Sequence, residues 1–246
     1  MVEIGDLSSI ISVLVLGAAS YQDVRRREVS DWIWAIGATA GAAAQLPSLI
    51  CMRGGELMRL LVSSAPLLLI LTASWLGRLM GEADILALIT LLIVNPCPRA
   101  GEISPPAFST LIYACSLMAL TPLGFLARNI LLLARGEDIF RGFREPAYRK
   151  LAAMLISTPV MPERAVELKY FSLAEVRGEG WRRFKLSAAL SSPYSSELQE
   201  LGRMSGGPVW LFPSLPFIPF LLAGFILAEL LGDPILGIMK LLGVAQ

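Results

Sequence analysis

The sequence predicts a mainly α-helical, polytopic membrane protein with six transmembrane helices. A small cytoplasmic α/β or mostly β domain is expected before the last helix. Of the 246 residues, 55% are hydrophobic and only 17% are charged, and the mean hydropathy is +0.64. Soluble domains carry about 25% charged residues. The apolar residues are concentrated in long blocks, which indicates helices in a bilayer rather than one large soluble core.

Six apolar segments follow one another along the chain. The first is long enough as a helix to cross about 30 Å of hydrocarbon. The fourth is short and ends at Asn95-Pro96-Cys97-Pro98, so a tilt, a thinned bilayer or a re-entrant path has to accommodate it. The expected spans are about 4–22, 32–51, 57–76, 84–96, 106–134 and 215–242.

These spans divide the chain into membrane helices at 1–134, a soluble domain at 135–210 and a last membrane helix at 211–246. In the soluble domain, apolar and polar residues alternate along 166–171, which predicts a strand. Gly178 and Gly180 predict a turn. Ser205-Gly206-Gly207-Pro208 is expected to be the linker that returns the chain to the membrane.

The placement of Lys and Arg predicts the orientation. Arg25-Arg26-Arg27 is the densest basic run, and it follows the first span. Loops rich in Lys and Arg stay on the cytoplasmic side. With this loop inside, all but four of the 21 basic residues lie inside, the exceptions being Arg53, Arg59, Arg99 and Lys240. We therefore expect an extracellular N-terminus and a cytoplasmic soluble domain.

Composition excludes several kinds of chemistry. The chain has no histidine, which removes Ser-His-Asp and Cys-His catalysis and histidine-bound zinc. Cys51, Cys97 and Cys115 are far apart and form no Cys-x-x-Cys motif. Cys51 and Cys97 fall at the outer ends of spans. There they can either form a disulfide or remain free thiols. With a net charge of +1 and no nucleic-acid-binding motif, we expect no nucleic acid partner, no metal and no cofactor.

Two aspartates lie at the ends of apolar segments. Asp23 ends the first and Asp84 opens the fourth, which places both at the cytoplasmic end of the predicted bundle. An ionisable carboxyl at the hydrocarbon boundary is costly and indicates function. Two carboxyls about 3–6 Å apart share a proton, so one can activate water while the other donates a proton. Such a pair titrates as a unit, so the sequence does not assign the two roles.

Each aspartate also has a purely structural interpretation. Asp23 can pair with the arginines that follow it, and Asp84 can pair with Arg78 or cap the fourth helix. Gly81 and Ala83, just before Asp84, are small and permit close approach of an extended peptide.

Two motifs carry a family resemblance. The run 22–34 resembles the first motif of type IV prepilin peptidases, an aspartate followed by basic residues, an aliphatic residue, a second aspartate and an aromatic residue. Gly81-Glu82-Ala83-Asp84 resembles their second motif, Gly-x-Gly-Asp, which presenilin-like proteases share. The small size, the six spans and the polar insert are most similar to the archaeal branch, the preflagellin peptidases. Ala83 replaces the usual glycine, which the backbone tolerates if φ is negative there.

The resemblance implies a membrane aspartyl endopeptidase with Asp23 and Asp84 as its catalytic residues. Its partners would be the lipid bilayer and the precursor of an archaellin or type IV pilin-like subunit. Such a precursor has a short basic leader before a hydrophobic helix, and cleavage falls on the cytoplasmic side. The residues expected to shape the site or bind substrate are Gly81, Glu82, Ala83, Glu28 and Asp31.

The remaining polar and aromatic residues of the spans have structural interpretations. Asp31 is expected to help cap the second helix. Trp32, Trp34 and Trp75 are expected in the aromatic belt at the membrane interface. Glu229, near the outer end of the last span, is expected to extend to water.

Two other functions fit part of the pattern. A small proton-coupled transporter would use the same two aspartates as proton sites, but it needs acids near the bilayer midplane and a path to both faces. A non-catalytic scaffold that docks a partner on its soluble domain would tolerate the replacement of both aspartates.

Overall fold

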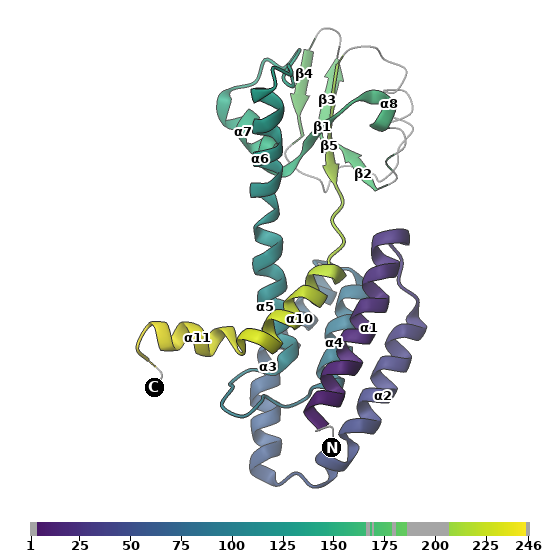
Figure 1. Cartoon of the computed structure of the whole chain (residues 1–246), viewed down its shortest axis with the longest axis vertical. Coiled ribbons are helices and arrows are strands. Elements are labelled where there is room, and N and C mark those ends of the chain that lie inside the picture. Colours follow the sequence, from purple (N-terminus) through teal and green to yellow (C-terminus); the bar gives the residue numbers. More distant parts are fainter. Residues whose placement is uncertain (1–3, 166–167, 169, 179–180, 186–206, 245–246) are drawn as a thin grey trace. The chain divides into compact units, whose positions relative to one another are not determined.

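The computed structural model describes residues 4–165, 168, 170–178, 181–185 and 207–244 (Figure 1). The chain forms two compact units. The helical unit is Met1–Met118 with Pro216–Gln246, and the sheet unit is Ala119–Leu215. The described residues are mostly helical with a small sheet region, which confirms the mainly α fold class.

The helical unit is built from helices that alternate in direction, because short loops join most neighbours in the sequence. One end of the unit carries the end of α1 and the beginnings of α2, α4 and α10, and we call it the aspartate end. The opposite end is the far end. The helices are α1 (Ile4–Arg26), α2 (Asp31–Ile50), α3 (Gly54–Gly77), α4 (Glu82–Val94), α5 (Pro106–Ala119), α10 (Ile218–Leu231) and α11 (Pro234–Leu241).

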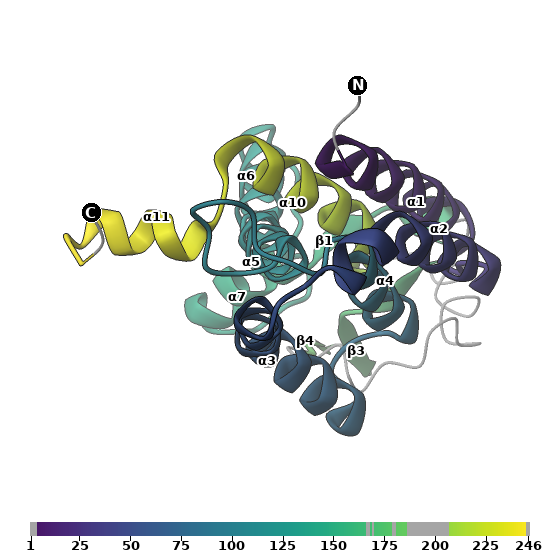
Figure 2. The same cartoon turned by 90° about the horizontal axis from the view of Figure 1, so that it is seen from below.

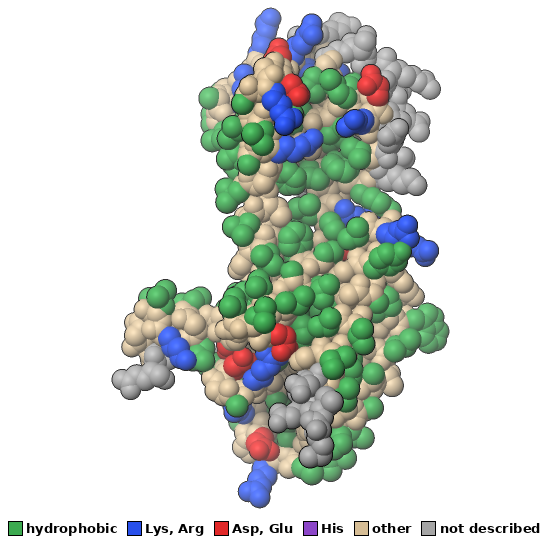
Figure 3. Space-filling view, viewed as in Figure 1, with side chains coloured by type: hydrophobic (Ala, Val, Ile, Leu, Met, Phe, Trp, Pro, Cys, Tyr) green, Lys and Arg blue, Asp and Glu red, His purple; other side chains and the backbone are tan. Residues whose placement is uncertain are grey.

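Among the residues that the structure describes, four helical stretches are long and apolar enough to cross a membrane, and α10 with α11 makes a fifth if the bent pair counts as one span. The expected number of six is therefore not reached. The helix α4 has 13 residues, which is about 20 Å and short of a bilayer crossing. Figure 3 shows hydrophobic side chains over much of the visible face of the helical unit, as a surface in contact with lipid requires.

The last predicted span is broken between α10 and α11, which bend by 52°. Gly232 has a positive φ of 77°, and Pro234 opens the new helix, so the first helix cannot continue. Asp233 caps α11 by accepting a hydrogen bond from the N–H of Ile235 at 2.9 Å. Its other carboxylate oxygen accepts from the N–H and the hydroxyl of Ser104, which ties the loop before α5 to the break.

Two glycines set the register between α2 and α4. A Cβ on Gly37 would lie 3.2 Å from Cγ2 of Thr90, and a Cβ on Gly41 would lie 2.9 Å from Cα of Val94. Small residues four apart let two helix backbones approach closely. In both pairs the two residues are 53 positions apart in the sequence, so α2 and α4 run parallel. Each α2 residue therefore lies level with the α4 residue 53 positions later. Figure 2 shows α1 beside α2 and α4, with α10 on its other flank.

The helix α10 packs closely against α5. A Cβ on Gly224 would lie 2.6 Å from the carbonyl oxygen of Thr110 and 2.8 Å from the backbone nitrogen of Ala114. Both neighbours are backbone atoms, which cannot rotate away. The core beside this contact includes Phe225 and Leu221, which are fully buried.

Polar side chains join the helices at the far end. Asn95 donates to the hydroxyl of Ser12 at 2.8 Å, which links α4 to α1. Glu229 forms an ion pair with Arg99 and accepts from the hydroxyl of Ser9 at 3.0 Å. The Glu229 side chain is 28% exposed, so the ion pair with Arg99, from the loop before α5, adds to the predicted path to water without excluding it. A carboxylate is tolerated in an apolar helix when a cation of this kind neutralises it.

All three cysteines are free, so the possible disulfide between Cys51 and Cys97 is not formed. Cys97 lies in the loop after α4, and burial raises the pKa of its thiol. A thiol with a raised pKa reacts slowly, because the thiolate is the nucleophile.

Within its described residues, the sheet unit combines two small antiparallel sheets with three helices. In the larger sheet the strand order is β1-β5-β2, and β3 pairs with β4 in the other. Its core contains the stacked rings of Phe140 and Trp210 and the stacked rings of Phe143 and Phe184. The elements are α6 (Thr121–Ala134), α7 (Ala147–Ile156), β1 (Thr158–Val160), α8 (Pro162–Ala165), β2 (Phe171–Leu173), β3 (Glu175–Gly178), β4 (Trp181–Phe184) and β5 (Val209–Pro213).

The prediction of a linker at 205–208 is wrong for the two residues that the structure describes, Gly207 and Pro208. Ser205 and Gly206 lie outside the described residues, but Pro208 leads directly into β5, the central strand of the larger sheet. The strand forms because Val209 and the three residues after it are all buried. The chain leaves the sheet unit only after Pro213.

The other two predictions for this unit are met in part. The strand expected at 166–171 overlaps β2 only at Phe171, and residues 166, 167 and 169 lie outside the described part. Gly178 ends β3 and pairs with Trp181 of β4, while Gly180 lies outside the described residues.

Candidate active site

The structure brings Asp23 and Asp84 together at the aspartate end of the helical unit. Asp23 lies in the last turn of α1, Asp84 lies in the first turn of α4, and both are partly buried. They are close enough for the charge of Asp23 to act on Asp84. Two carboxyl groups in this arrangement are suited to acid–base work on a bound substrate.

Two helix N-termini face this pair. The N–H of Ile218, the first residue of α10, donates to the carboxylate of Asp23. The N–H of Gly81, the residue before α4, donates to the carboxylate of Asp84. The N-terminus of a helix carries partial positive charge, so both helices stabilise negative charge on the pair. The role of Ile218 was not predicted from the sequence, because a backbone donor from a helix about 200 residues away leaves no side-chain signal.

Gly81 leaves room for the carboxylate of Asp84. Its φ of −65° is open to any residue, so backbone freedom is not the reason for glycine here. A Cβ at this position would lie 3.2 Å from Oδ2 of Asp84. Asp84 therefore also caps its own helix, as the structural interpretation held, and the cap fixes where its carboxylate sits.

Replacing Gly81 with alanine is expected to lower kcat for peptide cleavage about 10-fold and to leave KM nearly unchanged. The added methyl displaces the Asp84 carboxylate by a few tenths of an ångström, and misplaced catalytic groups lose rate steeply. Steady-state kinetics with a precursor peptide measures the effect. Gly54→Ala is the control, because its Cβ would meet nothing within 4 Å. Equal rates for the two variants would show that Gly81 does not position the carboxylate.

The other predicted site residues are Ala83, inside α4, and three exposed carboxylates. Ala83 lies within α4, and φ is positive only at Arg27 and Arg78 among the described residues other than glycine. The methyl of Ala83 is thus tolerated without strain. The remaining three carboxylates, those of Glu28, Asp31 and Glu82, are exposed on the loops and first turns at the aspartate end.

The structure specifies how Asp31 acts at the start of α2 and which arginine acts on Asp23. Asp31 begins α2, whose N-cap is Ser30, and the Ser30 side chain makes no capping hydrogen bond. Asp31 thus contributes through its charge in the first turn. The charge of Arg27 acts on Asp23, whereas Arg25 donates to the hydroxyl of Tyr21 at 2.6 Å.

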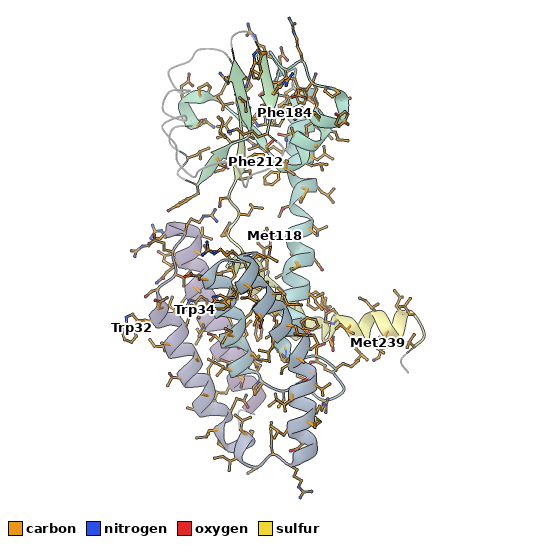
Figure 4. The ribbon with its side chains drawn as sticks, turned by 180° about the vertical axis from the view of Figure 1, so that it is seen from behind. Trp32, Trp34, Met118, Phe184, Phe212 and Met239 are labelled. Atoms are coloured by element: carbon orange, nitrogen blue, oxygen red, sulfur yellow. The ribbon has the colours of Figure 1, made fainter. Side chains whose placement is uncertain are left out.

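Trp34 is not part of an interfacial belt. Only 4% of it is exposed, whereas 74% of Trp32 and 68% of Trp75 are exposed. In Figure 4, Trp32 projects away from the helices and Trp34 lies among them. Trp34 shares one helix face with Gly37 and Gly41, and α1 and α4 pack against that face and bury it.

The comparison with protein families agrees with this geometry. Residues 10–123 match the model of the type IV leader peptidase family. Over these residues, which make up less than half of the chain, the protein is similar to that family. The matched segment contains both aspartates and reaches from α1 into the first turn of α6. No curated protein matches the chain.

The matched family indicates a peptidase, and the apolar helices indicate a multi-pass membrane protein. Most of the sheet unit lies outside the matched segment. Within the described residues, no group of three or more His, Cys, Asp or Glu side chains is placed to hold a metal ion.

Proposed function

We propose that this protein is an aspartyl endopeptidase that removes the short basic leader from archaellin or type IV pilin-like precursors. The observation that supports the proposal is the meeting of Asp23 and Asp84, two acids from separate helices of the matched segment, at one end of the helical unit. We propose that this end faces the cytoplasm, because Arg25-Arg26-Arg27 follows α1 there.

In the proposed reaction, one carboxyl of the pair is ionised and the other is protonated. The ionised group takes a proton from water as the oxygen attacks the peptide carbonyl carbon. The protonated group gives its proton to the carbonyl oxygen, which forms a tetrahedral intermediate. The C–N bond then breaks, a proton passes to the departing amine, and the pair returns to its first state. No covalent enzyme intermediate is needed.

The surroundings of the pair suit a precursor with a basic leader and an apolar helix. Three exposed carboxylates at the aspartate end can attract the basic leader, and these belong to Glu28, Asp31 and Glu82. The positive charges of Arg25 and Arg26 partly offset them. The apolar exterior of the helical unit keeps the precursor helix in the bilayer, so its leader junction reaches the depth of the pair.

The proposal is tested with purified enzyme in liposomes and a precursor peptide, with the products identified by mass spectrometry. We expect a single cut at the junction of leader and apolar helix. Chelators and serine-directed reagents are expected to leave the rate unchanged. Thiol-directed reagents are expected to have no effect, although Cys51 and Cys115 are exposed in the protein. Inhibition by a chelator, or no cleavage of any such precursor, would refute the proposed chemistry.

A further inference from the structure

Two buried hydrogen-bond donors near the aspartate pair lack a protein partner. The indole Nε1 of Trp34 and the hydroxyl of Ser20 have no hydrogen-bond partner within the described residues. Trp34 is 4% exposed and Ser20 is 8% exposed. A buried indole N–H normally finds an acceptor, and leaving it unpaired is unfavourable. These two donors are therefore free to bind an acceptor from outside the protein, such as a substrate oxygen.

The helix register places Trp34 beside the pair. By the offset between α2 and α4, Trp34 lies level with Ala87, which is one turn from Asp84. Side chains on a helix lean toward its N-terminus. The helix α2 begins at the aspartate end, so the indole of Trp34 leans from the level of Ala87 toward the level of Asp84.

Ser20 reaches the same level from a third helix. The pairing of Ser12 with Asn95 and the proximity of Asp23 and Asp84 show that α1 and α4 run antiparallel. Ser20 precedes Asp23 by three residues, and Ala87 follows Asp84 by three. Both residues therefore lie one turn from the pair, toward the far end. Ala87 is fully buried and contributes only a methyl group there. Two unpaired donors from two helices thus lie at the same level, one turn from the two acids.

We propose that the indole N–H of Trp34 donates a hydrogen bond to the carbonyl oxygen of the substrate peptide at the cleavage junction. The inference rests on the proposed peptidase function and adds a third group to the site. The carbonyl oxygen gains negative charge as water attacks, so a fixed donor binds the transition state more tightly than the bound peptide. The hydroxyl of Ser20 offers a second donor to the same stretch of substrate backbone.

The test compares Trp34→Phe with the matched control Trp32→Phe. Phenylalanine keeps an aromatic ring and removes the N–H. Trp34→Phe is expected to lower kcat about 10- to 100-fold and to change KM less than about threefold, since loss of one such donor acts mainly on the transition state. Trp32→Phe is expected to keep the wild-type rate, because Trp32 is exposed on the outside of the same helix.

A second substitution separates the hydrogen bond from packing. Benzothienylalanine at position 34 replaces the N–H with sulfur and keeps the two-ring shape, so it preserves the fold even if Trp34→Phe does not. It is expected to match the kcat loss of Trp34→Phe with an unchanged unfolding temperature. A kcat within twofold of wild type for the benzothienyl protein would overturn the inference. Absence of cleavage by wild type itself would instead defeat the proposed function, and the role of Trp34 with it.

Discussion

Replacing either Asp23 or Asp84 with asparagine is expected to lower the rate of precursor cleavage about 10²- to 10⁴-fold, the range that one acid–base group supplies. Asparagine has the same shape as aspartate but neither takes up nor releases a proton at neutral pH. Its side-chain oxygen can still accept from the N–H of Ile218 or Gly81, so the helices keep their places. Rates are measured by the appearance of mature product in liposomes that contain equal amounts of each variant.

The control for this experiment is Asp138→Asn, which makes the same chemical change at an exposed position of the sheet unit. Its rate is expected to equal that of wild type. If Asp23→Asn or Asp84→Asn retained a substantial rate, the two acids would not form the catalytic pair. Loss of proton flux in both variants with no change in cleavage would favour the alternative of a proton-coupled transporter.

Replacing Gly224 with alanine is expected to reduce the free energy of unfolding by about 1–3 kcal/mol, the usual cost of overpacking. The new Cβ would lie 2.6 Å from the carbonyl oxygen of Thr110, so α10 and α5 have to separate. Because the first N–H of α10 binds Asp23, this displacement is also expected to lower the cleavage rate. Thermal unfolding in one detergent, followed by circular dichroism, measures the loss of stability.

The control is Gly17→Ala on α1, where a Cβ would meet nothing within 4 Å. Alanine is favoured over glycine in a helix by about 0.5–1 kcal/mol, so this variant is expected to be as stable as wild type or slightly more stable. An unfolding temperature for Gly224→Ala equal to that of Gly17→Ala would show that α5 and α10 are not held in close contact.

Some features of the site follow from short stretches of sequence. Asp23 and Asp84 are conspicuous because a charge beside an apolar run is costly wherever the chain folds. The small residue at position 81 was expected to leave room, and the structure shows that the space is needed by the carboxylate of Asp84. The break at Gly232 and Pro234 was also present as a local signal, since both residues end helices. The prediction of one straight last span overlooked it.

Other features depend on which segments meet. Trp32 and Trp34 belong to one apolar helix, and only the packing of α1 and α4 decides that Trp34 is buried while Trp32 is exposed. The apolar run that begins at Val209 became a central strand because β1 and β2 flank it.

The sequence alone determined that the chain is an apolar helical protein with two acids at helix ends, because hydropathy and the cost of a charge are local properties. Only the tertiary structure decided that these acids meet, that the N–H of Ile218 supports one of them, and that Trp34 lies beside them. The physical reason is that each of these contacts joins separate helices, so its formation depends on the packing of the whole helical unit rather than on any one segment.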